Sequence, residues 1–121
     1  MWTGIRQIAP NRPLANIGFA IGAFVRKHHY TLVQNLASHG VGRSLHEEPS
    51  EVATWPDPSE RRKMHEGLVF TVEPFLSLGA ERAIDGDDPS TLFSDPHAPT
   101  VQYEHTVVVT RNGPAVVTLP S

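Results

Sequence analysis

The chain has 121 residues, about the size of one ordinary domain, and its 39% hydrophobic and 19% charged residues are typical of a chain that folds around a core and not of a disordered one. Its net charge of −3 provides no basic surface of the kind that nucleic acids or anionic membranes bind, so neither is expected as a partner. It contains no cysteine, so any metal ion must be held by histidines and carboxylates. No secretory signal and no stretch of 18 apolar residues is evident, and we expect a cytoplasmic protein.

The first clear element in the sequence is an amphipathic helix over residues 14 to 28. Apolar residues recur at helical spacing from Leu14 to Val25, and Arg26 and Lys27 follow at the C-terminal end, where the helix dipole favours cations. The residues before it contain two prolines and are expected to form an irregular lead-in. Residues 30 to 36 mix β-branched and apolar side chains, which predicts a strand.

Two long loops are predicted on either side of a strong strand. Residues 47 to 64 are polar and contain three prolines, and residues 80 to 100 are rich in aspartate and proline. Between them, residues 68 to 73 form an apolar strand that Pro74 closes. Strands over 103 to 110 and 115 to 119 follow, joined by a turn that contains an Asn-Gly pair. These patterns predict one α+β domain over residues 1–121, with one long helix packed on a mainly antiparallel sheet and two long loops.

Four residues are candidates for chemistry. His39 stands beside a glycine that lets the backbone turn tightly and leaves the imidazole accessible, and His46 follows seven residues later. Glu73 ends an apolar strand, where a buried carboxylate needs a compensating partner such as a metal ion. Glu104 stands at the start of another apolar strand. Each of these is a weak signal alone, because a single histidine beside a glycine is more often simply hydrogen-bonded than a metal ligand.

The order of these segments carries more information than any one of them. Together they resemble the type I methionine aminopeptidases, metallopeptidases with the pita-bread fold, and the resemblance runs from about Gly4 to Leu119. The matching segments are residues 39–42, 45–49, 70–74 and 102–106. The resemblance implies an α+β fold that corresponds to the C-terminal half of a pita-bread fold.

The resemblance also implies roles for the four candidates. His39, Glu73 and Glu104 would be metal ligands, with Glu104 bridging two divalent ions, and Glu73 would also act as general base and acid. His46 would contact the scissile peptide. The ions would be Co, Mn, Fe or Zn, and the substrate would be a peptide that begins with methionine. The complete family site holds two ions, whereas these three ligands are expected to hold at most one.

Several departures from the family pattern bear on activity. Two aspartate ligands and a further histidine of the family precede the motifs matched here, so we expect a truncated and impaired enzyme that needs a complementing N-terminal half or that self-associates through an exposed apolar sheet face. Ser38 replaces a glycine and is expected to tighten the turn at His39. Ser90 replaces a tryptophan of many relatives and is expected to open the methionine pocket.

Two alternatives remain open at this point. The chain is then either a catalytically inactive pita-bread remnant that binds peptides or proteins, or a member of the proline-specific dipeptidase and creatinase branch of the same fold. Retention of His39, His46, Glu73 and Glu104 favours an enzyme origin. The segments around Glu73 and Glu104 fit the methionine-specific branch better.

Overall fold

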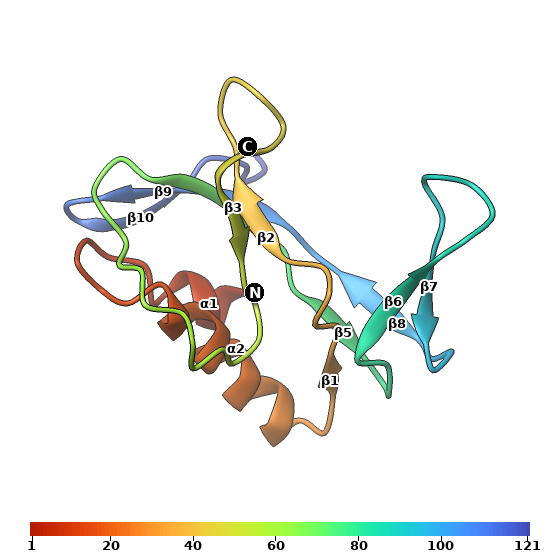
Figure 1. Ribbon diagram of the computed structural model, residues 1–121. Coiled ribbons are helices and arrows are strands. Elements are labelled where there is room, and N and C mark those ends of the chain that lie inside the picture. Colours follow the sequence, from red (N-terminus) through yellow and green to blue (C-terminus); the bar gives the residue numbers. More distant parts are fainter.

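The computed structural model describes residues 1–121 (Figure 1). Two helices and ten strands follow one another along the chain. They are α1 (Trp2–Ile5), α2 (Ala15–Lys27), β1 (Thr31–Leu32), β2 (Ser38–Gly40), β3 (Glu47–Val52), β4 (Val69–Val72), β5 (Phe75–Ser77), β6 (Arg82–Asp85), β7 (Leu92–Asp95), β8 (Thr100–Gln102), β9 (His105–Thr110) and β10 (Gly113–Val116).

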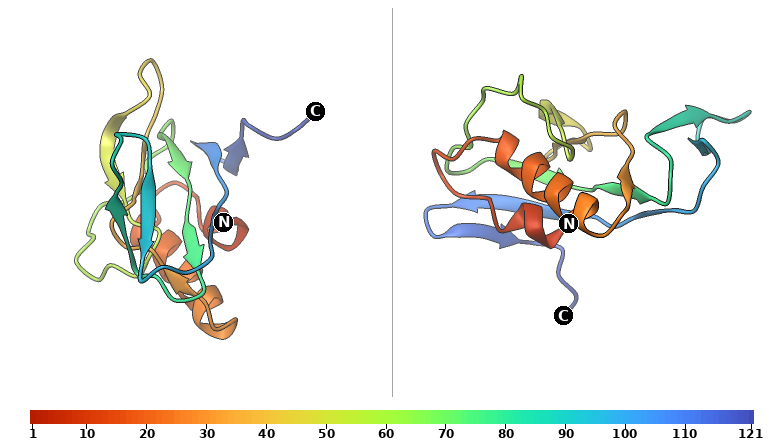
Figure 2. Two further views of the ribbon diagram at one scale, coloured as in Figure 1. Left: turned by 90° about the vertical axis from the view of Figure 1, so that its right-hand side faces the viewer. Right: turned by 90° about the horizontal axis from the view of Figure 1, so that it is seen from below.

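The main sheet has five antiparallel strands in the order β10-β9-β4-β2-β3. Both helices lie along one face of it (Figures 1 and 2). Ile17 and Ile21 on α2 are fully buried in one core cluster with Phe70 of β4 and Val107 of β9. Of the apolar residues predicted to face the core, Phe24 is 39% exposed and the others are buried, so the expected helix packed on a mainly antiparallel sheet is confirmed.

Two smaller sheets extend the fold to one side of the main sheet (Figure 1). One has the antiparallel order β1-β5-β8, and the other is the hairpin β6-β7. Two residues separate β4 from β5, and two residues separate β8 from β9, so the same two segments of chain build both the main sheet and the first small sheet. Neither helix has the length and apolar composition of a membrane-spanning segment.

Both predicted loops contain strands. Residues 47–52 form β3, which is an edge strand, and an edge position tolerates Pro49 because one side needs no ladder hydrogen bond. The segment 80–100 contains β6 and β7, whose residues Ile84 and Phe93 face each other across an aspartate-rich turn. Because these segments are rich in proline and aspartate, their composition did not predict the short strands, which pairing with neighbouring strands stabilises.

Smaller differences concern the ends of elements. The expected lead-in contains the short helix α1, and the expected strand over residues 30 to 36 pairs only through Thr31 and Leu32. The last two strands are confirmed as the hairpin β9-β10, although they span 105–110 and 113–116. At their turn the positive φ of 106° falls on Gly113, and Asn112 has an ordinary backbone conformation.

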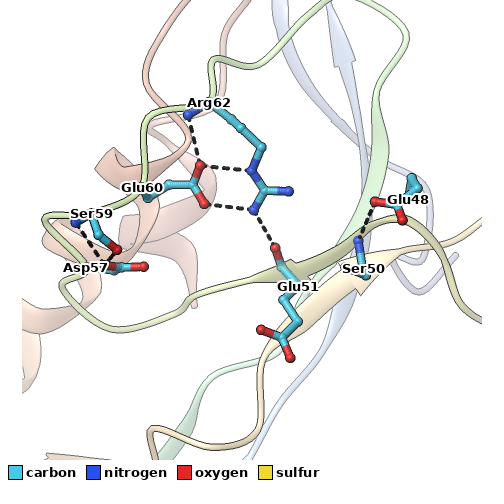
Figure 3. A network of polar contacts seen from close by, with 7 residues as sticks. All are labelled: Glu48, Ser50, Glu51, Asp57, Ser59, Glu60 and Arg62. Atoms are coloured by element: carbon cyan, nitrogen blue, oxygen red, sulfur yellow. Dashed lines mark hydrogen bonds and ion pairs between the residues drawn. The ribbon is translucent and has the colours of Figure 1, made fainter.

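The remaining loop, residues 53 to 68, is pinned beside the start of α2. The Arg62 side chain donates to both carboxylate oxygens of Glu60 and, through Nη2 at 2.7 Å, to the carbonyl oxygen of Glu51 in β3 (Figure 3). The backbone of Arg62 in turn accepts a hydrogen bond from the Leu14 amide at 2.9 Å. One residue therefore connects the helix start, the loop and the edge strand that follows His46.

Candidate active site

Strands β2 and β4 bring two of the predicted site residues together. His39 is the middle residue of β2, and Glu73 directly follows the last residue of β4. The two strands are antiparallel neighbours with Gly40 opposite Phe70, so the chain direction places residues 37 to 39 beside residues 71 to 73. The proximity of His39 and Glu73 is thus a consequence of the sheet register.

The His39 imidazole is held in one orientation. Its side chain is only 10% exposed, and Nδ1 lies 2.8 Å from the carbonyl oxygen of Gly40. A carbonyl oxygen can only accept, so this hydrogen bond requires the proton to be on Nδ1. In the neutral ring, Nε2 then carries a lone pair, and it lies 3.6 Å from Oε2 of Glu73.

The Glu73 carboxyl group lacks a partner where it faces the imidazole. The side chain is 14% exposed, and its buried Oε2 makes no hydrogen bond. Burial is the largest influence and raises the pKa of Glu73, the Thr71 hydroxyl lowers it, Glu104 raises it, and His39 has the smallest effect and lowers it. A buried carboxyl oxygen without a donor is costly unless a proton or a cation neutralises it.

Two acceptors therefore face each other with no donor between them. An imidazole nitrogen and a carboxylate oxygen form the type of donor set that zinc, manganese, iron and cobalt bind. The position of Oε2, buried and unpartnered beside Nε2 of His39, fits a divalent cation as the missing partner. A proton shared between the two groups would satisfy the same atoms.

His46 joins this pair from the loop before β3. Its ring centroid lies 4.0 Å from that of His39, with the ring planes tilted by 36°. His46 is exposed, whereas His39 is buried, so His46 stands at the mouth of the site and His39 at its base. The three side chains line a cavity of about 260 Å³ together with Asn35, Leu36, Ala37, Ser50, Glu51 and Phe75.

Glu104 lies at the margin of the site. It precedes β9, is exposed, and accepts a hydrogen bond of 3.3 Å from Nε2 of Gln102. The pKa of the Glu73 carboxyl group is raised in part by Glu104. No three histidine, aspartate or glutamate side chains surround one common point, however, and the role of Glu104 as a third ligand stays a prediction.

Two expectations about the segment around His39 are wrong. The imidazole is mostly buried, at the base of the cavity, and residues 38 to 40 form a strand and not a tightened turn. Gly40 is required for close approach between strands, because a Cβ atom there would lie 2.2 Å from the carbonyl oxygen of Glu48. Ser38 is bonded across the sheet, with its Oγ accepting the Glu73 amide at 3.0 Å.

Two hydroxyl residues contribute to the site in ways that sequence reasoning did not assign. Besides the Ser38 bond, the His39 amide donates to Oγ1 of Thr71 at 3.1 Å. Thr71 is the one polar residue within the apolar strand β4, which is the signal that could have identified it. The sequence shows Ser38 as a departure from glycine, but its hydrogen-bond partner depends on the register of the sheet.

Ser90 lies outside this cluster, on the exposed turn between β6 and β7. Its Oγ donates to Oδ1 of Asp88 at 2.7 Å, and Asp88 also accepts from the Thr91 hydroxyl. These bonds, with that to Thr91 the largest, lower the pKa of Asp88 to about 2. Ser90 thus contributes hydrogen bonds that stabilise this turn. Its effect on a methionine pocket stays a prediction.

The comparisons with known proteins agree with the fold and the motifs. Methionine aminopeptidase of Staphylococcus epidermidis is 38% identical over 114 residues, which are 94% of this chain and 45% of that protein. The crystal structure of methionine aminopeptidase from Rickettsia prowazekii is similar with a TM-score of 0.90 and 32% identity, over 98% of this chain and 48% of that chain. The chain spans about half the length of the curated relatives it matches, which agrees with the expected match to a C-terminal half.

A solved prolidase from Pyrococcus furiosus shares the fold, with a TM-score of 0.68 and 18% identity over 99% of this chain and 29% of that chain. Both values are lower than those for the Rickettsia enzyme, in agreement with the better fit to the methionine-specific branch. The sequence itself matches metallopeptidase family M24 over residues 1–111. Because this match includes His39, Glu73 and Glu104 and the strands next to them, the fold and the motifs point to the same conclusion: the chain belongs to metallopeptidase family M24.

Proposed function

We propose that this chain carries one half of the catalytic centre of a metal-dependent methionine aminopeptidase, which removes the N-terminal methionine from new polypeptides in the cytoplasm. The observation that supports this most is the buried, unpartnered Oε2 of Glu73, which faces Nε2 of His39 at 3.6 Å. The reaction class is inferred from the relatives, which are methionine aminopeptidases. The proposal treats residues 1–121 as one partial catalytic domain.

His39, Glu73 and Glu104 would hold a divalent ion, and Co, Mn, Fe and Zn all suit one imidazole and two carboxylates. When bound, such an ion acidifies a water molecule and stabilises negative charge at the scissile carbonyl oxygen. The complete site of the family holds two ions, and the residues of this chain alone would hold at most one. His39 is preorganised for this role because its Nδ1 hydrogen bond to Gly40 directs Nε2 to the carboxyl group.

The protein groups would then divide the proton transfers. Glu73 would take a proton from the attacking water and deliver it to the leaving amine, and a buried carboxyl with a raised pKa is suited to hold that proton between the two steps. His46 would donate a hydrogen bond to the peptide at the mouth of the cavity, where its exposed ring can reach a bound chain. The ring contact with His39 sets the direction from which His46 approaches.

A complementing N-terminal half, or self-association, is proposed to complete the site. A shallow apolar cavity of about 390 Å³ lies on the β5-β8 side of the smaller sheet, where Leu78 and Val101 are both more than 60% exposed. Large exposed apolar side chains of this kind mark interaction surfaces. Analytical ultracentrifugation of the chain tests this proposal, since a strictly monomeric species that melts cooperatively would contradict it.

Calorimetric titration of the 121-residue chain with Mn, Co and Zn salts, together with hydrolysis of a Met-Ala-Ser peptide, tests the proposed function. We expect one ion to bind, its binding to be lost in Glu104→Ala, and hydrolysis to be slight or absent. The exposed Glu81, with its carboxylate free of hydrogen bonds, provides the matched Glu81→Ala control. Metal-dependent turnover would show that the chain is not impaired. No binding of any ion would support the inactive remnant that binds peptides or proteins.

A further inference from the structure

Backbone pairing holds the strand that carries His39 only loosely against its neighbours. The register between β2 and β4 consists of the single pair Gly40 and Phe70. On its other side, the register between β2 and β3 shifts between Ser38 and Gly40. A strand of three residues with one pair on one side, and two pairs separated by an irregularity on the other, is weakly specified by its ladder. The register brings His39 and Glu73 side by side, and other contacts must therefore help to fix the distance between them.

Two buried hydroxyl groups supply those contacts. The His39 amide donates to Oγ1 of Thr71 at 3.1 Å, and the Glu73 amide donates to Oγ of Ser38 at 3.0 Å. Ser38 is fully buried and Thr71 almost so, which means that water does not compete for these bonds. At the end of the β2-β4 pair, the backbone amides of His39 and Glu73 are thus held by side-chain hydroxyl groups and not by ladder hydrogen bonds.

Ser38 is in a special position among these groups because it touches both sides of the site. It is the covalent neighbour of His39, and its side chain binds the backbone of Glu73. The Ser38 hydroxyl thus connects the Glu73 amide to the residue that directly precedes His39. A displacement of either residue must therefore stretch this bond.

We propose that Ser38 is a positioning residue that sets the separation between His39 and Glu73. Its hydroxyl holds the Glu73 backbone, so that Oε2 stays 3.6 Å from Nε2 of His39. Its value as a support for metal ligands rests on the function proposed above, whereas its effect on the geometry does not. Ser38 itself has no role in proton transfer or ligation.

Removal of the hydroxyl leaves the Glu73 amide without an acceptor in a buried place. Alanine keeps the Cβ atom, so the packing around residue 38 changes little. The amide must then either stay unsatisfied or rotate toward another acceptor, and rotation moves the carboxyl group away from His39. A purely structural serine would affect stability without moving the carboxyl relative to the imidazole.

Ser77→Ala is the matched control, because Ser77 is also buried and its Oγ accepts a backbone amide, that of Ala80, at the same 3.0 Å. Ser38→Ala, Ser77→Ala and the wild-type chain are compared without metal by amide hydrogen exchange and by the ¹⁵N and ¹H shifts of the His39 ring. We expect the Glu73 amide to exchange at least about tenfold faster in Ser38→Ala than in Ser77→Ala, and the His39 ring shifts to change only in Ser38→Ala. Equal exchange at Glu73 and unchanged ring shifts would overturn the proposal.

Ser38→Gly provides a second variant without the hydroxyl if Ser38→Ala folds poorly, and it is judged by the same two criteria. Zinc titration of the three chains adds an independent readout. We expect an affinity about tenfold lower in Ser38→Ala than in Ser77→Ala, as is typical when an outer support of a metal ligand is removed. If the wild-type chain binds no zinc, the proposed function fails, and the positioning role is decided by the exchange and shift data alone.

Discussion

Replacement of Glu73 by glutamine is expected to stabilise the metal-free chain and, at the same time, to abolish its binding of divalent ions. In the wild-type chain, Oε2 of Glu73 and Nε2 of His39 are two acceptors that face each other at 3.6 Å. A glutamine amide can present an N–H group at the same place and donate to Nε2, after a small shift to about 3.0 Å. In the variant, the glutamine amide would thus form the hydrogen bond to Nε2 of His39, and no cation would be needed between the two side chains.

The magnitude follows from the burial of this one oxygen atom. A buried acceptor without a partner costs about 1–3 kcal/mol, and Oε2 of Glu73 is such an atom. Allowing for the entropy of ordering the amide, we expect the free energy of unfolding to rise by about 1–2 kcal/mol at pH 8. For a chain of this size, that corresponds to a melting temperature roughly 5–10 °C higher.

The gain must depend on pH, because the folded structure raises the pKa of Glu73. Below the unfolded-state value of about 4.3, the carboxyl group is protonated in both states and is uncharged like the amide of the variant, so the wild type and the variant should be similar in stability. As the pH rises through the raised folded-state pKa, the wild type loses this contribution and the difference grows. The advantage of Glu73→Gln is therefore expected at neutral and alkaline pH and not near pH 3.

Urea denaturation followed by circular dichroism at pH 3.5, 6 and 8, in the presence of a chelator, measures these differences. Glu81→Gln is the control, since Glu81 is exposed and should show no comparable gain at any pH. A Glu73→Gln chain that is less stable than the wild type at pH 8 would refute the reasoning, because it would mean that the carboxylate is already satisfied in the folded chain. Zinc calorimetry on the same samples checks the loss of binding.

Three further predictions concern the frame around the site. Gly40→Ala should destabilise the chain by about 3 kcal/mol or more in urea denaturation, because its Cβ would lie 2.2 Å from a β3 carbonyl oxygen, whereas Gly79→Ala, with 3.9 Å to its nearest neighbour, should change stability by less than about 1 kcal/mol. Glu60→Gln should lower the free energy of unfolding at pH 7 by about 1 kcal/mol, a value already reduced for solvent screening because the Arg62 side chain is 48% exposed. The difference between variant and wild type in urea denaturation should disappear as the pH falls below about 4.3 and through the lowered pKa of Glu60. Phe70→Ala should cost about 3–5 kcal/mol in thermal melting, since the ring is fully buried, and a loss below about 1 kcal/mol would contradict its place in the core.

Local patterns in the sequence were sufficient to predict the helix α2, the strand β4 and the final hairpin. The helix has an apolar stripe at 3.6-residue spacing, and β4 is an apolar run between Gly67 and Pro74. The apolar side chains of these elements pack together in one core, which stabilises the local structure that the pattern predicts. The strands β3, β6 and β7 were not predicted because Pro49 lies within β3 and because the segment around β6 and β7 is rich in aspartate and proline. Pairing with a neighbouring strand stabilises each of them in the fold.

The sequence by itself determined which residues were candidates for the site, since His39, His46, Glu73 and Glu104 lie in four ordered segments of the family pattern. The tertiary structure alone decided which of them meet. Register between antiparallel strands places His39 beside Glu73, whereas Glu104 stays at the margin.

The role of Ser38 was likewise undecided in the sequence, where it was only a departure from glycine. A hydrogen bond between residues 35 positions apart depends on the register of β2 and β4, and this register is set by the packing of the whole sheet on α2. Residue type is a local property, but the distance between two side chains from different strands is a property of the assembled core. For this reason the sequence named the chemical groups of the site, and the fold determined their geometry.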